Sequence, residues 1–233
     1  MLTENLKTVV KRVQNAALHC GRDPESVRLV AVTKTVPVHR IKEAIEAGVD
    51  IFGENYVQEA RDKIRELGSW PVSWHFIGTL QSNKAKYAVK LFDLIHSVDS
   101  IKLATELDKQ AEKIGKVQHI LIQVNVAGET QKSGFAPEDA LDMLKEISRF
   151  DHISVKGLMT MPPYFYDPER VRPFFKQLRD LRDRLQESLA RLSYAGRTDL
   201  AELSMGMTGD FEAAIDEGAT LVRIGTAIFG ERA

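Results

Sequence analysis

Hydrophobic residues follow two patterns that alternate along the chain. Near the N-terminus they recur at helical spacing, which predicts an amphipathic helix within residues 1–20. Short apolar runs then alternate with further helical patterns. The run from Leu29 to Thr33 is apolar or β-branched throughout and carries no charge, as is typical of a strand covered on both faces. Lys34 follows this strand at once, and Pro37 opens a helical pattern that Gly48 is placed to end.

Eight strands are predicted in this way, each followed by a helix or a helical turn. They cover residues 29–33, 51–52, 74–77, 94–98, 119–126, 153–158, 200–204 and 221–225. Pro137 is expected to start the helix after the fifth strand, and the longest helical pattern runs from Val171 to Leu189. The count and the length predict an α/β fold, a single (β/α)8 TIM barrel with an extra N-terminal helix. An open doubly wound sheet, which needs fewer strands, is the alternative.

One domain is expected over residues 1–233, with the helix of residues 1–20 packed on the barrel, because no linker or low-complexity run interrupts the alternation. Of the 233 residues 43% are hydrophobic, which is enough for one substantial core. Lys and Arg number 32 against 33 for Asp and Glu, so no positive field recruits nucleic acid or an anionic membrane. Cys20 is the only cysteine, and neither a signal peptide nor a bilayer-spanning run is evident. We therefore expect a cytoplasmic protein.

Polar residues follow the predicted strands. In a barrel of this kind, binding groups lie at the carboxyl ends of the strands, all at one mouth. The candidates there are Lys34, Gly53-Glu54-Asn55, Gly78-Thr79, Ser97, Asp99, Asn125, Met159-Thr160, Ser204 and Arg223. Each taken singly has an ordinary explanation, since Asn, Ser and Gly form turns and a lysine that caps a strand is usually solvated. Their convergence indicates a site.

The last two strand ends are the most specific. Ser204 to Gly209 and Arg223 to Thr226 supply small residues, hydroxyls and backbone N–H groups near helix N-termini, which suit a phosphate, although glycine also serves tight turns. Arg223 alternates with Val222 and Ile224. If those two pack outward, the guanidinium points into the barrel mouth and needs an acceptor. That acceptor is either a carboxylate of the barrel, or a ligand's ring nitrogen or phosphate.

The histidines within strands, His75 and His96, have no spacing with His, Cys or carboxylates that suggests zinc. We interpret them as packed or hydrogen-bonded core residues and expect no metal. A lysine at a strand end is the usual nucleophile for a Schiff base. Together with a phosphate-binding turn it predicts either a sugar phosphate, as in an aldolase, or pyridoxal 5′-phosphate (PLP). The residue chemistry leaves both open.

Several longer motifs favour the second ligand. They are Ala31-Val32-Thr33-Lys34-Thr35, Phe52-Gly53-Glu54-Asn55-Tyr56-Val57-Gln58-Glu59, His75-Phe76-Ile77-Gly78, Leu80-Gln81, Asn83-Lys84, His96-Ser97-Val98-Asp99, Lys132-Ser133-Gly134, Gly157-Leu158-Met159-Thr160-Met161, Ser204-Met205-Gly206-Met207-Thr208 and Val222-Arg223-Ile224-Gly225-Thr226. With these motifs the chain resembles the pyridoxal-phosphate homeostasis proteins, the YggS/PROSC family, from the first strand to the C-terminus.

The resemblance implies a fold like the N-terminal barrel of alanine racemase, with Lys34 holding PLP as a Schiff base. It also implies that Arg223 lies near the cofactor ring and that Asn55 lies near the ring or its oxygen. Around the phosphate it implies Ser204, Thr208, Gly225 and Thr226. Thr208 stands where serine is more usual, and it keeps the hydroxyl.

The resemblance further implies a carrier that acts in intracellular PLP homeostasis and supply, with no catalytic residue. PLP-dependent apo-enzymes are candidate recipients, and we expect a monomer. A racemase-type enzyme using the same lysine is the alternative. A racemase needs a second acid or base opposite the lysine, which related racemases bring from a C-terminal β domain, whereas this sequence reaches Ala233 shortly after the last predicted strand.

Overall fold

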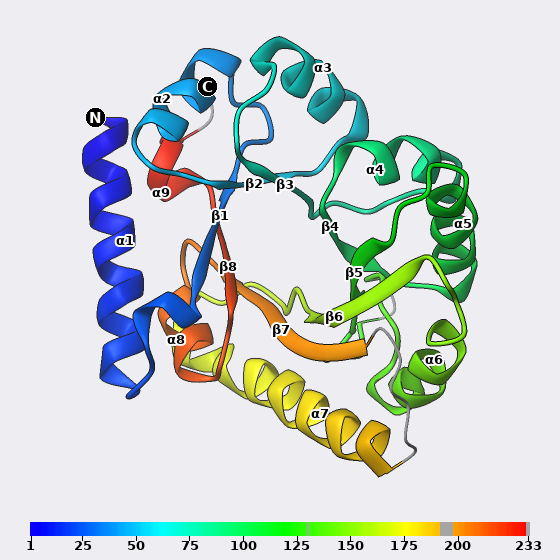
Figure 1. Ribbon diagram of the computed structural model, residues 1–233. Coiled ribbons are helices and arrows are strands. Elements are labelled where there is room, and N and C mark those ends of the chain that lie inside the picture. Colours follow the sequence, from blue (N-terminus) through cyan, green and yellow to red (C-terminus); the bar gives the residue numbers. More distant parts are fainter. Residues whose placement is uncertain (130, 192–197, 232–233) are drawn as a thin grey trace.

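The computed structural model describes residues 1–129, 131–191 and 198–231 of the chain. Its strands form one closed barrel of eight parallel strands in chain order, β1 to β8 (Figure 1). The barrel closes where β1 pairs with β8, with Ala31 opposite Ile224. This closure confirms the predicted barrel and excludes the open sheet.

The bounds of the elements follow the hydrophobic pattern closely. The strands are β1 (Arg28–Val32), β2 (Ile51–Glu54), β3 (Ser73–Phe76), β4 (Leu94–Val98), β5 (Gln118–Gln123), β6 (Ile153–Met159), β7 (Thr198–Met207) and β8 (Leu221–Ile224). The helices are α1 (Leu2–His19), α2 (Val38–Glu46), α3 (Val57–Leu67), α4 (Ala85–Leu91), α5 (Ile101–Glu112), α6 (Ala140–Ile147), α7 (Arg172–Arg191), α8 (Phe211–Asp216) and α9 (Thr226–Phe229). Short 3-10 turns cover Pro24–Ser26, Ser82–Lys84, Pro137–Asp139 and Pro168–Arg170.

Most strand ends lie within one or two residues of the prediction, and those of β5 and β7 differ most. The fifth strand ends at Gln123 and not at Val126, because Asn125 donates its backbone N–H to the carbonyl of Phe135 in a loop. The seventh strand continues to Met207, past Ser204, and its register against β8 shifts between these two residues. An apolar run shows that a strand is buried, but it does not show where the chain leaves the sheet.

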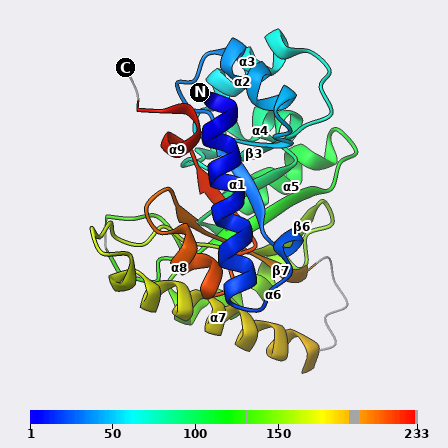
Figure 2. The same ribbon diagram turned by 90° about the vertical axis from the view of Figure 1, so that its left-hand side faces the viewer.

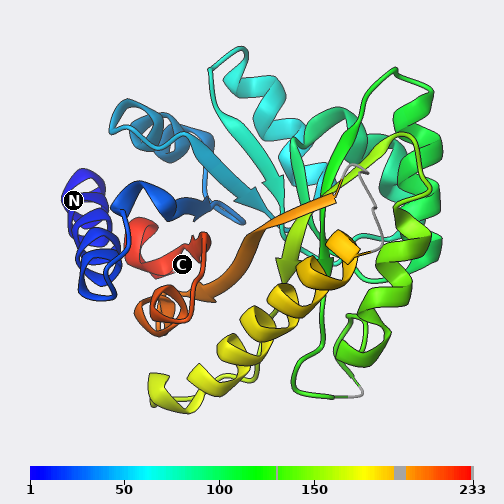
Figure 3. The same cartoon turned by 60° about the horizontal axis from the view of Figure 1, so that its bottom comes forward.

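The core has two parts, because successive strand residues point to opposite sides of the barrel wall. Six side chains from six strands form a cluster of their own inside the barrel: Val30, Ile51, Leu94, Leu121, Met159 and Leu221. The larger cluster lies between the strands and the surrounding helices, and includes Phe52 and Phe175. Figure 3 shows the longest helix, α7, along the outside of the barrel, where it packs on β6 and β7.

The first helix, α1, lies against the last helices of the chain, α8 and α9 (Figure 2). Leu6, Val9 and Val13 are buried on its inner face. The side-chain amide of Asn5 donates to the carbonyl of Ile228, over 3.2 Å, and so ties the two ends of the chain together. No helix in residues 1–129, 131–191 or 198–231 has the length and apolar character needed to cross a membrane.

Candidate functional site

Four strand ends bring most of the predicted binding residues to one mouth of the barrel. Lys34 follows β1, Asn55 follows β2, Thr208 follows β7 and Thr226 follows β8. Because the strands are parallel and the barrel is closed, these four ends lie on the same rim. The hydroxyl of Thr226 donates to that of Thr208 over 3.2 Å, which joins the loops after β7 and β8.

Arg223 points into the barrel, as the alternation predicts. Its neighbours Val222 and Ile224 are fully buried in the outer core, while the Arg223 side chain lies inside the barrel and is 4% exposed. Of the two alternatives for its acceptor, the carboxylate is not the one found among the described residues: Nη1 donates to the hydroxyl of Ser204 over 2.6 Å and Nη2 to the carbonyl of Thr160 over 3.0 Å. Burial lowers the pKa of Arg223 to about 10, so the guanidinium keeps its charge at neutral pH.

Ser204 continues this contact into a chain of buried groups. His96 Nδ1 lies 2.8 Å from the Ser204 hydroxyl, and His96 Nε2 lies 3.0 Å from His75 Nδ1. Since Ser204 accepts a hydrogen bond from Arg223, its hydroxyl donates to His96 Nδ1, and His96 Nε2–H donates onward to His75 Nδ1. Burial lowers the pKa of His75 to about 4 and that of His96 well below its usual value, so both rings are neutral at pH 7. The interpretation of these histidines as hydrogen-bonded core residues is confirmed.

The sequence did not indicate this position for Ser204. The residue is fully buried, and its hydroxyl contacts Arg223 and His96 below the rim. The contact joins side chains from β4, β7 and β8, which are far apart in the sequence, and no sequence pattern pairs them. The expected place of Ser204 beside a phosphate stays a prediction.

Lys34 occupies a tight turn directly after β1. The carbonyl of Thr33 accepts a hydrogen bond from the N–H of Val36, over 2.9 Å, so Lys34 and Thr35 are the two central residues of a β-turn. Thr35 has a φ of 64°, a left-handed conformation that a β-branched residue rarely adopts. Backbone strain of this kind clusters at functional sites, where the surroundings must hold it in place. Lys34 itself is half-buried.

Two other candidates have side chains that bind the protein itself. Glu54 is fully buried, and its carboxylate contacts the Lys63 amine and the Thr33 hydroxyl outside the mouth. Asn125 lines a cavity on the rim, but its Nδ2 donates to the carbonyl of Glu129 over 2.8 Å within its own loop.

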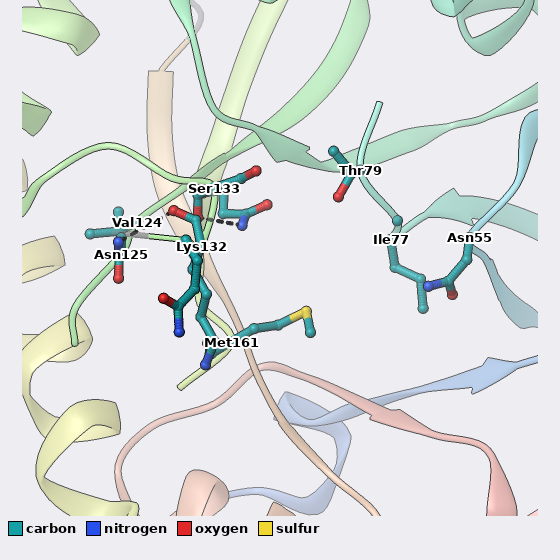
Figure 4. Close-up of a pocket in the computed structure, with 11 residues that line it drawn as sticks. Asn55, Ile77, Thr79, Val124, Asn125, Lys132, Ser133 and Met161 are labelled. Carbon is teal, nitrogen blue, oxygen red and sulfur yellow. Dashed lines mark hydrogen bonds between the residues drawn. The ribbon is translucent and has the colours of Figure 1, made fainter. Parts of the chain in front are cut away.

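A cavity of about 260 Å³ opens on another part of the rim (Figure 4). Asn55, Thr79, Lys132 and Met161 are among its lining residues, whereas Lys34, Thr208 and Thr226 are not. The Oδ1 atom of Asn55 is buried and, within the described part of the chain, has no hydrogen-bond donor. A buried acceptor without a donor is costly, so a bound molecule with an N–H or O–H group would satisfy it.

Residues 1–129, 131–191 and 198–231 contain no group of three or more His, Cys, Asp or Glu side chains that could hold a metal ion. The polar groups of the rim are instead an amine, hydroxyls, an amide and a guanidinium. Together they can bind an anion and an aromatic ring and present a nucleophilic nitrogen.

Comparison with known proteins agrees with this set of groups. The family model of the alanine racemase N-terminal domain matches residues 4–233. The pyridoxal phosphate homeostasis protein of Aquifex aeolicus is 45% identical over 98% of this chain and 97% of its own length. Its counterpart from Escherichia coli K12 is 40% identical over 99% and 97%.

Solved structures show the same relationship. PipY of Synechococcus elongatus, with PLP bound, superposes with a TM-score of 0.84 at 37% identity, over 99% of this chain and all of PipY. Alanine racemase of Clostridium difficile matches 98% of this chain with a TM-score of 0.72, but at 16% identity and over 57% of the racemase, so this likeness shows the barrel fold alone. The chain therefore belongs to the pyridoxal phosphate homeostasis proteins, a family built on the alanine racemase N-terminal domain.

Proposed function

We propose that this chain binds PLP, holds it covalently through Lys34, and serves to store and supply the cofactor to PLP-dependent apo-enzymes. The observation that carries the proposal is the convergence on one rim of a strand-end lysine, a hydroxyl pair and a buried guanidinium. The PLP bound in PipY, 37% identical over the full chain, supports it.

The phosphate of PLP is assigned to Thr208, Gly225 and Thr226. The two threonine hydroxyls lie 3.2 Å apart, and neither is fully buried, so both can turn toward an anion. Ser204, also expected at the phosphate, is assigned a different part, since its hydroxyl already contacts Arg223 and His96. Within this proposal Ser204 orients Arg223.

The ring of PLP is assigned to Arg223 and Asn55. PLP supplies an aldehyde that condenses with a lysine amine, releasing one water, and a ring that withdraws electrons from the attached group. Arg223 keeps its protons at neutral pH, so it would donate a hydrogen bond to a ring nitrogen without protonating it. The orphaned Oδ1 of Asn55 fits an N–H or O–H donor of the bound group.

Absorption spectroscopy with chemical trapping tests the proposal directly. We expect purified protein, loaded with PLP, to show a visible band that borohydride abolishes, and peptide mapping to place the reduced adduct on the peptide that contains Lys34. Lys34→Ala should lose the trapped adduct. Lys86→Ala, a change at an exposed lysine, should retain it. If the protein takes up no PLP, the proposal is wrong, and a sugar phosphate becomes the expected ligand.

A carrier and a racemase-type enzyme differ in what they do to an amino acid. The carrier is favoured because relatives at 40% to 45% identity over nearly their whole length are homeostasis proteins, whereas the racemase likeness extends to the fold alone. The loaded protein should be incubated with single enantiomers of common amino acids in deuterated water. Loss of optical purity, or Cα exchange faster than with free PLP, would show an enzyme.

A further inference from the structure

The turn that presents Lys34 is strained, and a buried group of charged residues lies directly behind it. Thr35 holds its left-handed φ of 64° without the help of a glycine. The side chains that contact the turn are Glu54 at the end of β2, and Glu59 and Lys63 on α3. We refer to these three residues as the Lys63 clamp.

Lys63 is the centre of the clamp. Its side chain is 8% exposed, and its amine lies 2.5 Å from the carbonyl of Thr33, 2.7 Å from Glu54 Oε1 and 2.7 Å from Glu59 Oε1. A lysine ammonium has three protons to donate, so all three have acceptors.

The two carboxylates extend the contact to both sides of Lys34. On the N-terminal side, the hydroxyl of Thr33 donates a hydrogen bond to Glu54 Oε1 over 2.7 Å. Glu59 Oε1 accepts the backbone N–H of Thr35 over 2.5 Å, on the C-terminal side. Both residues flanking Lys34 are thereby bound to one cluster, and the strained φ is held by contacts from outside the turn.

The clamp lies on the outer side of the barrel wall. Gly53 points inward, where a Cβ would meet Val30 and Ile77, so its neighbour Glu54 points outward toward α3. The Lys63 clamp therefore does not reach into the mouth, and it can act on a ligand there only through the backbone that carries Lys34 and, next to Glu54, Asn55.

A buried cluster of charged side chains contributes little to the stability of the fold. Removing charges from water offsets most of the attraction between them, and well-packed apolar residues often replace a buried ion pair without loss. One oxygen of Glu54 has no hydrogen-bond partner in the described residues, and burial raises the pKa of this carboxyl against the opposing effect of Lys63. A role in positioning accounts for the arrangement better than a role in stability.

We propose that Lys63, acting with Glu54 and Glu59, is a positioning residue that holds the strained turn and so directs the Lys34 amine toward the aldehyde of PLP. The inference rests on the proposed function, in which that amine and the aldehyde join with release of one water. By this inference, the three residues of the Lys63 clamp, which lie outside the mouth, also govern the attachment of PLP to Lys34.

The test compares Lys63→Met with a matched lysine. Lys116 also donates to two backbone carbonyls, those of Val89 and Phe92, but it lies between α5 and β5. We expect Lys63→Met to slow attachment of PLP to Lys34 by about 10- to 100-fold, because misplacing a reacting group by about 1 Å can cost as much as about 100-fold in rate. Lys116→Met should lose about as much thermal stability as Lys63→Met, but it should attach PLP at the rate of the unaltered protein.

A second change distinguishes positioning from general damage. Glycine adopts a left-handed φ without strain, so Thr35→Gly added to Lys63→Met should restore much of the lost rate. If Lys63→Met does not fold, Glu59→Met decides the matter, because Glu59 is a quarter exposed and its loss leaves Lys63 paired with Glu54. Attachment at the unaltered rate in the folded variant, or equal slowing by Lys116→Met, would overturn the proposal.

The reactivity of Lys34 without PLP separates this inference from the proposed function. Competitive acetylation followed by peptide mapping gives the rate at which each lysine amine reacts. If the unaltered protein binds no PLP, the proposed function fails, while a change in Lys34 acetylation in Lys63→Met still supports the clamp. If PLP attaches normally and neither rate changes, only the clamp fails.

Discussion

The guanidinium of Arg223 and the hydroxyl of Ser204 are joined by a 2.6 Å hydrogen bond inside the barrel. Ser204 also contacts His96, so one small side chain holds two larger ones. This relationship separates Ser204, a buried hydroxyl that orients Arg223, from the hydroxyls on the rim, which are placed to bind a ligand.

Replacing Ser204 by alanine should therefore destabilise the protein. Arg223 Nη1 and His96 Nδ1 would each lose a buried partner, and an unsatisfied buried group costs about 1–3 kcal/mol. Urea unfolding of the PLP-free protein measures the loss. Thr208→Ala is the control, because its hydroxyl is only half-buried and its removal should change stability by no more than about 0.5 kcal/mol. Equal losses in the two variants would contradict the distinction.

The rim threonines should determine whether the phosphate is recognised. In Thr208→Ala/Thr226→Ala we expect PLP to lose affinity while pyridoxal, which lacks the phosphate, keeps its own. Charge-assisted hydrogen bonds contribute about 1.5–3 kcal/mol each, so the preference for PLP should fall at least about tenfold. Fluorescence or absorbance titration with both ligands gives the ratio. An unchanged ratio would place the phosphate elsewhere.

The buried histidines should make the protein less stable in mild acid. The pKa of His75 is about 4 in the folded chain and near 6.5 when exposed, so the unfolded chain binds the proton more tightly. The His75 contribution is fully present above pH 6.5 and is lost as the pH falls toward 4, by about 3 kcal/mol at most.

A pH series of urea unfolding curves checks this expectation. Burial raises the pKa of Glu54 and Asp210, and a raised carboxyl pKa has the opposite sign, adding stability as the pH falls. At each pH, the unfolding free energy of His75→Gln should therefore be subtracted from that of the unaltered protein. The contributions of Glu54 and Asp210 cancel in this difference, which leaves that of His75. Parallel curves for the two proteins between pH 6.5 and 4 would refute the assignment to His75.

A glycine beside the rim should prove irreplaceable. A Cβ built on Gly78 lies 2.3 Å from the carbonyl oxygen of Asn55, so Gly78→Ala forces the backbone of Asn55 to move. We expect a loss of about 1–3 kcal/mol in unfolding free energy and weaker PLP binding. Gly209→Ala meets nothing within 4 Å and should leave stability unchanged. Equal unfolding free energies for Gly78→Ala and Gly209→Ala would contradict this prediction.

The barrel was predictable because each strand is a short run buried on both faces, and parallel closure follows from eight such runs separated by helices. The rim residues Lys34, Asn55, Thr208 and Thr226 follow from that topology. The hydrogen-bonded chain from Arg223 through Ser204 to His75 was not predictable, because it joins side chains from four strands that lie far apart in the sequence. Lys63 was missed for a similar reason: a lysine on a helix is normally solvated, and its burial requires acceptors from separate parts of the chain.

The closure of the barrel has a consequence for the order of events during synthesis. Lys34 follows the first strand, whereas Arg223 belongs to the last strand and Thr226 to the helix after it, and β1 meets β8 to complete the sheet. A nascent chain on the ribosome therefore exposes its reactive amine long before the groups assigned to the phosphate and ring are translated. A product truncated before β8 keeps the lysine but has no binding site, so its reaction with aldehydes would be as unselective as that of any surface amine.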